Sequence, residues 1–384
     1  MSTISKFVFF SKNFLPKVST NSVLHRKHSF ACPANTAFKE AERLTSVPLS
    51  HFQIKNMMRD EYDLSQFALD KVIDLKRCLH ENNHPIISVA QQIFEECDSE
   101  HQKVYSSGGL VVLLVAKVLQ SVPSFKESSQ IWDKQKVLAE CYEMIDKAMF
   151  IHHKSIINIP PNNDNDKHLD ILNSGNKLAV LGGDYLFSYG IIRLASLVKR
   201  ASVFDFIGAA IDDYCITHFK CDHEDKHGNM FPWEGISVTD WEQLGGYCST
   251  NLLAYSCQYV AILSNLSSIR FEKAAYDLGR NLRLKWNIEE DIKSITDEER
   301  EDFKLFSAPV VLHIQRHPKF LRELHNLSKD DKMNIKKIKE IILEGNAVKD
   351  CEVLLNDYSS SALRATNLFP DNEERQSLRN IIFA

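Results

Sequence analysis

Two acidic side chains, Glu290 and Asp291, stand at the end of a helical pattern and could bind a divalent cation. The apolar residues of 271–286 recur at spacings of three and four, which predicts one buried helix face, and Glu290 continues that face. A carboxylate there either lines the mouth of a cavity or marks the point where the helix rises into solvent. Two acids suffice for Mg²⁺ only when substrate phosphates complete its coordination shell.

A second helical pattern, in EMIDKAMFIHHKSIINI (143–159), also ends in polar residues on its inward face. The residues of this stripe are first apolar or small and then polar. In order they are Val137, Cys141, Ile145, Ala148, His152 and Ser155. Lys154, Ser155 and Asn158 stand at this end, where a core-facing stripe either caps the helix or lines a cavity.

Three further motifs point to structure rather than to chemistry. The cysteines and histidines of CITHFKCDHEDKHGN (215–229) match no standard zinc-finger spacing, which favours a helix end entering a polar loop. The acid pair of IDDY (211–214) lacks a third carboxylate one turn on and is typical of a solvated helix face. The Gly-Gly pair of NKLAVLGGDYLFSYG (176–190) indicates close helix packing, and Asp184 there needs a partner.

The elements that hold these motifs are predicted to be helical throughout. Only 13 glycines and 11 prolines occur in 384 residues, and 44% of the residues are hydrophobic, so we expect long helices around a sizeable core. No alternating strand pattern occurs, and the helical period indicates one all-α domain over residues 50–384. The predicted helices are 52–80, 86–97, 108–121, 131–157, 169–199, 202–219, 240–264, 269–293, 305–327, 332–345, 347–366 and 371–383.

Charge and composition exclude several classes of protein. A net charge of −5 gives no electrostatic reason to expect nucleic acid, and no apolar run approaches the length of a transmembrane segment. Nine cysteines without a CxxC pair suit free thiols in a reducing compartment. Residues 1–39 contain six basic residues and no acid, which predicts a mitochondrial transit peptide; the alternative is an ordinary disordered tail.

The order of the motifs resembles the trans-polyprenyl diphosphate synthase family, which includes the farnesyl and geranylgeranyl diphosphate synthases. The match covers most of residues 80–384, and it runs through the helix of 143–159, AVLGGDYLF, GRNLRLKWNIEED, SAPVVL and FPDNEERQSLRNIIFA. SAPVVL and NIIFA resemble in particular the second subunits of decaprenyl diphosphate synthases. The resemblance implies a single-domain, isoprenoid-synthase-type helical bundle around a deep central cavity.

The resemblance also implies a chemistry whose ligands this chain has lost. The family binds Mg²⁺ and a substrate diphosphate with DDxxD motifs on two facing helices. The first motif aligns with Lys154, Ser155 and Asn158, and the second aligns with Glu290, Asp291 and Ser294, preceded by Trp286 and Asn287 in place of the usual Phe and Gln. Both motifs are degenerate, so we expect no catalytic residue and no metal site in this chain. Glu290 and Asp291 are the only residues of the two motifs that are candidates for binding a metal ion.

The basic diphosphate-binding segments of the family are damaged as well. Gly108 and Gly109 keep the glycines of a Gly-Gly-Lys segment, but the next cation is Lys117. The Lys-Thr pair that precedes a later helix in the family has no counterpart, because residues 227–272 contain no lysine.

These losses imply a non-catalytic, structural or regulatory subunit of a heteromeric all-trans-polyprenyl diphosphate synthase in the mitochondrial matrix. The expected partner is the catalytic subunit 1, which carries the Mg²⁺. The two subunits are expected to form a hetero-oligomer, for example a heterotetramer, and this complex elongates an allylic diphosphate for the ubiquinone side chain. The helix of 178–199, with its small residues, is the expected interface. Two alternatives stay open: a self-sufficient prenyltransferase that binds diphosphate through Lys154 and one metal ion on Glu290 and Asp291, and a helical scaffold outside isoprenoid metabolism.

Overall fold

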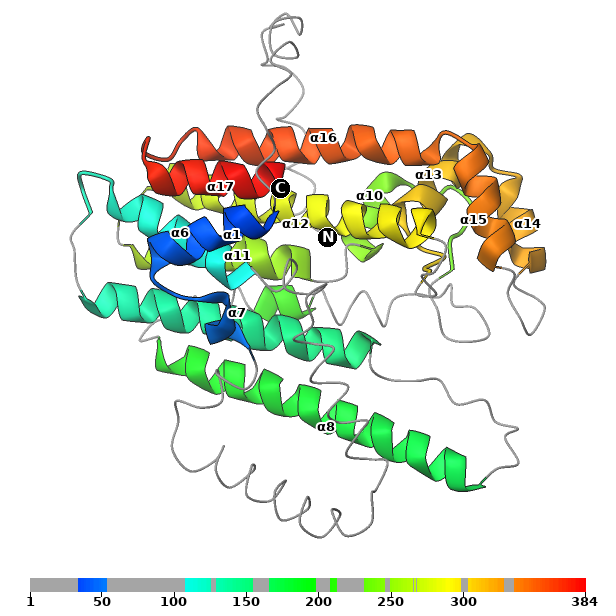
Figure 1. Cartoon of the computed structure of the whole chain (residues 1–384), viewed down its shortest axis with the longest axis horizontal. Helices are drawn as coiled ribbons and strands as arrows, with labels where there is room; N and C mark the ends of the chain where they lie inside the picture. Colours follow the sequence, from blue (N-terminus) through cyan, green and yellow to red (C-terminus); the bar gives the residue numbers. More distant parts are fainter. Residues whose placement is uncertain are drawn as a thin grey trace, which may run out of the picture.

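The computed structural model is all-α in the part of the chain that it describes (Figure 1). It describes residues 34–53, 108–125, 129–154, 166–197, 208–212, 231–245, 249–264, 266, 268–297, 303–327 and 335–384. The helices are α1 (Ala34–Thr45), α6 (Gly108–Gln120), α7 (Ser129–Lys154), α8 (Asp166–Ser196), α10 (Val238–Asp240), α11 (Ser249–Leu263), α12 (Ile269–Thr296), α13 (Ala308–Arg316), α14 (Phe320–Leu327), α15 (Ile335–Glu344), α16 (Ala347–Thr366) and α17 (Glu373–Phe383), with a 3-10 helix η2 (Leu49–Phe52) and a π-helical turn η4 (Trp241–Gly245).

Helix α6 lies at the centre of the larger hydrophobic core. Eleven of its thirteen residues are buried, because α1, α7, α11 and α17 surround it. Its sequence, GGLVVLLVAKVLQ, is apolar on every side, as a helix enclosed by others requires. The prediction of a helix over 108–121 is therefore confirmed, and the structure adds that this helix is enclosed.

Helix α12 joins the larger core to a second one. Leu278 and Leu282 belong to the core around α6, whereas Leu284 and Ile288 belong to a core shared with α13, α14, α15 and α16. Gly279 lets α11 approach α12 closely, since a Cβ there would lie 2.8 Å from the carbonyl oxygen of Leu253. The helix that carries the second motif is thus anchored at both ends.

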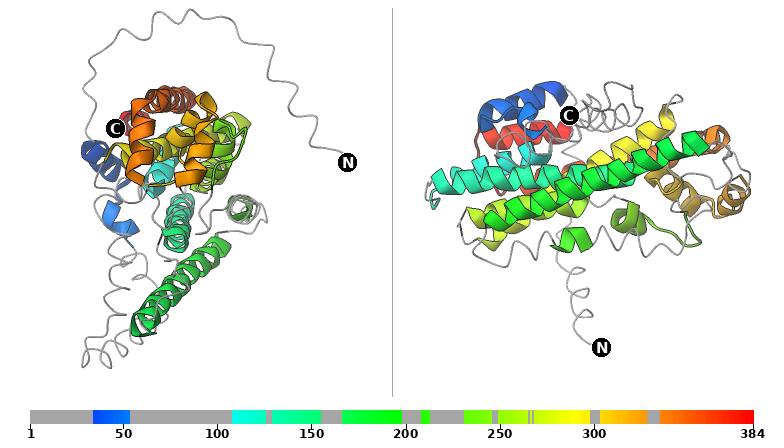
Figure 2. Two further views of the ribbon diagram at one scale, coloured as in Figure 1. Left: turned by 90° about the vertical axis from the view of Figure 1, so that its right-hand side faces the viewer. Right: turned by 90° about the horizontal axis from the view of Figure 1, so that it is seen from below.

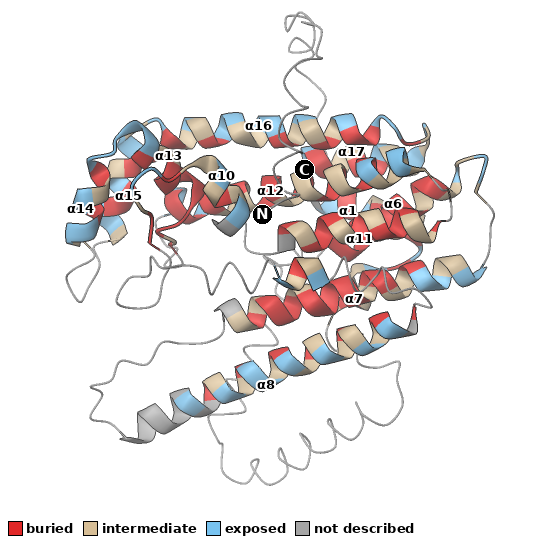
Figure 3. Cartoon of the chain, turned by 180° about the vertical axis from the view of Figure 1, so that it is seen from behind, coloured by how far each residue is buried: buried red, intermediate tan, exposed pale blue. Residues whose placement is uncertain are grey.

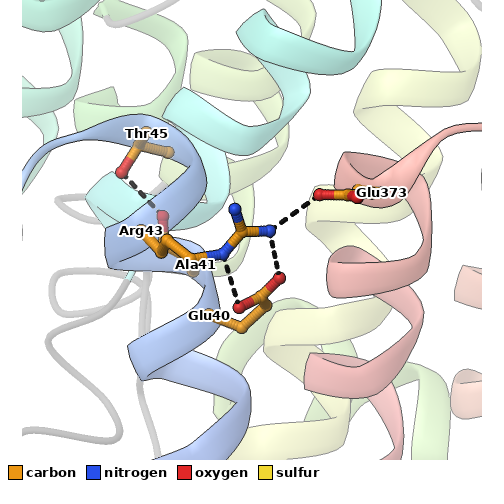
Figure 4. Close-up of polar contacts among 5 residues, drawn as sticks. All are labelled: Glu40, Ala41, Arg43, Thr45 and Glu373. Carbon is orange, nitrogen blue, oxygen red and sulfur yellow. Dashed lines mark hydrogen bonds and ion pairs between the residues drawn. The ribbon is translucent and has the colours of Figure 1, made fainter.

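Helix α1 ties the start of the described chain to its end. Ala37, Phe38 and Ala41 are buried, and α1 packs against α6 and α17. Figure 4 shows Arg43, whose Nη2 lies 2.7 Å from both Glu40 Oε1 and Glu373 Oε2 on α17. These ion pairs are exposed and contribute little, so the buried apolar side chains hold the helix in place.

Helix α1 overlaps the end of the predicted N-terminal segment. The composition predicts a transit peptide or a disordered tail over residues 1–39, yet residues 34–39 are helical and form the first turns of α1, so the alternative of disorder is wrong for them. The alanines and Phe38 that bury themselves against α6 outweigh that composition. The transit-peptide prediction for the residues before Ala34 lies outside the described part of the chain.

The predicted helices agree with the structure except at two breaks. One predicted helix, 305–327, is two, because α13 ends at Arg316 and Pro318 lies in the turn before α14. The predicted helix 240–264 is likewise divided into α10, η4 and α11, with Gly245 at the end of η4. The predictions 52–80, 86–97 and most of 202–219 fall largely outside the described residues.

Helix α8 lies along the edge of the molecule beside α7 (Figures 1 and 2). Two of its glycines face α7: Gly183 and Gly190 are buried, and a Cβ at Gly190 would lie 3.2 Å from Ile145 Cγ1. Gly183 and Gly190 therefore serve packing within the chain, and the prediction that 178–199 forms a subunit interface stays a prediction.

The opposite face of α8 is largely exposed (Figure 3). Residues 175–195 are long and apolar enough to cross a membrane by length and composition, with 28% of the most apolar stretch buried. The sequence shows no continuous apolar run here, since Asp184 and Arg193 interrupt it.

Candidate functional site

The second motif lies on α12, where Asp291 is almost fully buried, with 5% of its surface exposed. Its Oδ2 accepts a hydrogen bond of 3.0 Å from Trp241 Nε1 and one of 2.8 Å from the backbone N–H of Ala308. The carboxylate therefore joins η4 and the first residue of α13 to α12. This satisfies a free N–H at the start of α13, which has no side-chain cap from Ser307.

The other two positions of this motif differ from Asp291. Ser294 is buried, and its Oγ donates a hydrogen bond of 2.8 Å to the backbone carbonyl of Asp291, one turn earlier. Glu290 is half-buried. Because Ile288 and Ile295 are fully buried around them, the alternative that this helix rises into solvent is wrong.

Burial dominates the electrostatics of Asp291. Loss of water raises the pKa of its carboxyl group to about 6, and the neighbouring charge of Glu290 adds to the rise. The positive charge of Lys304 and the hydrogen bonds from Ala308 and Trp241 act in the opposite direction and keep the shift moderate. Asp291 is thus an internal acceptor that stays ionised above about pH 6.

The first motif lies at the end of α7, which is described as far as the backbone of Lys154. Ser155 and Asn158 lie outside the described residues, as does the Cys- and His-rich span 215–229. The inward stripe that leads to the motif is confirmed, because Cys141, Ile145 and Ala148 are all buried. Asp212, of the acid pair, is exposed, as predicted for a solvated helix face.

Two to three turns before that end, α7 carries a buried ion pair. Glu143 Oε1 accepts a hydrogen bond of 2.7 Å from the backbone N–H of Gly109, and its Oε2 lies 3.2 Å from Lys147 Nζ. Lys147 also donates a hydrogen bond of 2.7 Å to the carbonyl oxygen of Phe52. Burial raises the pKa of Glu143 to about 7, while Lys147 and the Gly109 N–H oppose that shift.

Two further carboxylates of α7 are held by arginines of other helices. Asp146 lies 3.6 Å from Arg283 on α12, so the two motif helices are joined by an ion pair. Glu140 pairs with Arg193 of α8 and with His51 Nε2 at 2.8 Å. The charges along the inner side of α7 are therefore balanced within the chain.

The glycines at the start of α6 have a packing role. A Cβ at Gly108 would lie 2.2 Å from the ring of Tyr142, and one at Gly109 would lie 2.9 Å from the side chain of Glu143. The next cation of the segment, Lys117, lies 4.4 Å from the ring centroid of Trp132 in a cation–π contact. Its charge is directed to an aromatic ring far from the glycines.

The predicted partner of Asp184 and the predicted close packing at the Gly-Gly pair are found together. A Cβ at Gly183 would lie 2.2 Å from Nε2 of His152, which therefore fits only against a glycine. His152 Nε2 lies 3.2 Å from the carbonyl oxygen of Val180 and 3.3 Å from Asp184 Oδ1. The inward stripe of α7 thus ends in a contact with α8.

The described residues do not fit a Mg²⁺ site on the second motif. Mg²⁺ takes oxygen ligands in octahedral geometry and keeps several waters, but Asp291 is buried and its Oδ2 already accepts two hydrogen bonds. Ser294 donates to a backbone carbonyl, which leaves Glu290 as the motif's single partly exposed carboxylate. No group of three or more His, Cys, Asp or Glu that could hold a metal ion occurs in the described ranges.

Sequence reasoning missed the residues that hold Asp291 and Glu143. Trp241 and Ala308 lie 50 and 17 positions from Asp291, and no spacing rule connects them. Glu143 and Lys147, in contrast, are opposite charges four residues apart within a stripe predicted to be buried. That signal was present in the sequence, and it predicts an internal ion pair.

No family model matches the chain, but comparisons with individual proteins confirm the resemblance to trans-polyprenyl diphosphate synthases. The all-trans-polyprenyl-diphosphate synthase PDSS2 of Rattus norvegicus is 28% identical over 374 residues, which cover 94% of this chain and 89% of that protein. The human PDSS2 is 27% identical with the same coverage. A probable mitochondrial hexaprenyl pyrophosphate synthase of Neurospora crassa is 25% identical over 66% of this chain and 58% of its own length.

Solved structures confirm the fold. A polyprenyl synthase from Caulobacter crescentus, complexed with calcium and isoprenyl diphosphate, superposes with a TM-score of 0.64 at 15% identity. The match covers 92% of this chain and 97% of that one. A decaprenyl diphosphate synthase from Rhodobacter capsulatus gives a TM-score of 0.55 at 16% identity, covering 80% and 96% of the two chains. The all-α isoprenoid-synthase fold is therefore shared.

Proposed function

We propose that this chain is a non-catalytic subunit of a heteromeric all-trans-polyprenyl diphosphate synthase. The observation that carries the proposal is the position of Asp291, which is buried and accepts hydrogen bonds from Trp241 and Ala308. The first motif contributes no carboxylate, because Lys154, Ser155 and Asn158 stand at its three positions. Ionisation of an allylic diphosphate needs metal ions held by carboxylates on both facing helices, and this chain lacks them.

The internal ion pairs support the same proposal. Glu143, Asp146 and Glu140 of α7 each have a cationic partner within the chain. The Asp146–Arg283 pair joins α7 to α12 and the Glu140–Arg193 pair joins α7 to α8. All three carboxylates are thus engaged within the chain, which leaves none of them for a substrate-bound metal ion. The chain keeps the shape of a synthase and uses its polar residues to maintain that shape.

The partner in this proposal is the catalytic subunit, which carries intact aspartate motifs and the Mg²⁺. The relatives named PDSS2 and the mitochondrial hexaprenyl pyrophosphate synthase support a polyprenyl diphosphate product and a mitochondrial location. The proposal adds that the location is the matrix and that the product becomes the ubiquinone side chain. The role of this chain is to stabilise its partner by packing and to help shape the channel for the growing product. The assembly is a hetero-oligomer, in its simplest symmetric form a heterotetramer.

Activity of the separate and mixed subunits tests the proposal. The purified chain is incubated with farnesyl diphosphate, isopentenyl diphosphate and Mg²⁺, alone and with the aspartate-motif synthase subunit from the same cell. We expect no elongation by this chain alone and long-chain product from the mixture. Turnover by the isolated chain would instead support a self-sufficient prenyltransferase, and a mixture no more active than the partner alone would favour a scaffold outside this pathway.

A further inference from the structure

The end of helix α13 carries two histidines one turn apart, in the part of the molecule where α13, α14 and α15 gather (Figure 1). The imidazole rings of His313 and His317 lie beside each other, with 4.9 Å between their centroids and 43° between their planes. His313 is buried, with 6% of its surface exposed, whereas His317 is exposed. Positions four residues apart lie on one face of a helix, so the two rings can reach a common ligand.

Two neighbours hold the ring of His313 in place. A Cβ at Gly345 would lie 2.9 Å from His313 Nδ1, so the missing side chain makes room for the ring. The ring of Phe320 packs edge-on against the imidazole, with 4.6 Å between the centroids. Nδ1 is buried and has no hydrogen-bond partner among the described residues. Because Nδ1 is covered by Gly345, Nε2 is the nitrogen of this ring that can bind a ligand.

The separation of the two rings fits imidazoles that share one metal ion. A Zn–N bond is about 2.1 Å long and an imidazole nitrogen lies about 1.1 Å from its ring centre, so the ion would lie about 3.2 Å from each centroid. At N–metal–N angles of about 90–110° the two centroids are then about 4.5–5.2 Å apart. The observed 4.9 Å lies within this range. Rotation of the exposed His317 ring about its Cβ–Cγ bond turns a nitrogen toward the ion and leaves the ring centre nearly in place.

The charges around the two rings favour a cation. His317 follows the last residue of α13, and the carboxyl end of a helix carries partial negative charge. The positive charge of Arg316 is balanced by Asp350 of α16, which pairs with it. Glu323 on α14 lies near enough for its charge to act on His313. The two imidazoles are thus the nitrogen ligands already in place, and water and the exposed Glu323 can complete the shell.

We propose that Nε2 of His313 and the ring of His317 form a binding site for a Zn²⁺ ion. Imidazole nitrogen is a preferred ligand of zinc, whereas Mg²⁺ takes oxygen ligands, so this site differs in chemistry from the second motif. A bound ion would fix the end of α13 beside Phe320, the first residue of α14, and so stabilise the second core. The inference concerns this chain alone and does not depend on the proposed function.

Isothermal titration calorimetry of the full-length chain, stripped of metal with EDTA and titrated with Zn²⁺, tests the proposal. The variant His317→Ala removes an exposed ligand, so folding is preserved, and every other zinc-binding group of the chain is unchanged. Changes in the outer shell of a metal site already cost about 10–100-fold in affinity, so loss of this ligand should weaken one Zn²⁺ equivalent at least about tenfold. The matched control is His325→Ala, because His325 is an exposed histidine of α14 whose ring stacks on Phe231. The control should bind Zn²⁺ as the wild type does.

Thermal unfolding supplies a second measurement on the same three proteins. Zn²⁺ should raise the melting temperature of the wild type and of His325→Ala relative to that of His317→Ala, and Mg²⁺ should produce no such difference. Equal zinc stoichiometry and affinity in the wild type and His317→Ala would overturn the inference, as would an equal loss of zinc in His325→Ala. A difference that Mg²⁺ reproduces would overturn it too, because a magnesium site requires oxygen ligands.

Discussion

Replacement of Asp291 by alanine separates a structural role of the second motif from a catalytic one. In the folded chain the carboxylate accepts hydrogen bonds from Trp241 Nε1 and the Ala308 N–H, and both donors lie in buried surroundings. Without it, the indole N–H and the first N–H of α13 have no acceptor. The variant therefore loses the connection of η4 and α13 to α12.

The size of the effect follows from those two donors. Each buried donor left without a partner costs about 1–3 kcal/mol, so the two together cost about 2–6 kcal/mol. The substitution also removes a buried carboxylate that is ionised at pH 7.5, because its pKa is about 6, and this gain offsets part of the cost of the two unpaired donors. We expect the free energy of unfolding to fall by about 2–3 kcal/mol. Asp291→Asn keeps an oxygen acceptor and is expected to recover most of that loss.

Urea unfolding followed by circular dichroism measures the stability, and steady-state turnover of the reconstituted complex measures the activity. The neighbouring Glu290→Gln is the matched control, since Glu290 is half-buried and on the same turn. We expect Glu290→Gln to change the unfolding free energy by less than about 1 kcal/mol and each assembled complex to keep its turnover within about threefold. The reasoning is refuted if Asp291→Ala leaves stability unchanged while the assembled complex loses turnover about a hundredfold, which corresponds to about 2.7 kcal/mol of barrier.

Three further predictions concern other parts of the chain. Burial raises the pKa of Glu143 from 4.5 to about 7, so the contribution of this residue to stability is present below pH 4.5 and is lost as the pH rises through 7. In urea unfolding, the wild type should therefore lose about 2–3 kcal/mol of unfolding free energy relative to Glu143→Gln between pH 5 and pH 8. Parallel pH dependences of the two proteins would contradict this prediction. Gly183→Ala should lower the melting temperature, because the added Cβ displaces His152. Gly208→Ala is the control and should leave the melting temperature equal or higher, because a Cβ there meets nothing within 4 Å. Equal losses in the two variants would argue against a specific contact at Gly183. Deletion of residues 1–33 should leave the melting temperature unchanged, whereas deletion of residues 1–45 should lower it by removing α1; tolerance of the longer deletion would show that α1 is dispensable.

The fold could be predicted from the sequence where hydrophobic pattern and length agree. Helix α6 is visible as a continuous apolar run, and the inward stripe of α7 and the long α12 are visible as spacings of three and four. The division of 305–327 could have been predicted from Pro318, and the start of α1 could not, because the helices that α1 packs against, α6 and α17, are remote in sequence. Periodicity identifies a helix well and its ends poorly.

The candidate site was predicted less completely than the fold. The loss of carboxylates from the first motif is a property of residue types and needs no structure. The hydrogen bonds of the Asp291 carboxylate depend on Trp241 and on the start of α13, and only the tertiary structure brings these three together. For the same reason the sequence predicts close helix packing at Gly183 without naming His152 as its neighbour, since a glycine on a helix face can pack within a chain or between chains.

The central claim is that all catalytic carboxylates come from the partner. The most direct test compares two complexes, in each of which the motif carboxylates of one subunit are replaced by amides. One complex combines the wild-type partner with this chain carrying Glu290→Gln and Asp291→Asn. The other combines wild-type chain with a partner whose aspartate motifs are changed to asparagine, and assembly of both is verified by size-exclusion chromatography with light scattering. We expect the first complex to elongate farnesyl diphosphate at a rate within about threefold of the wild type and the second to be inactive. Activity in the second complex, or a loss of about a hundredfold in the first, would contradict the claim.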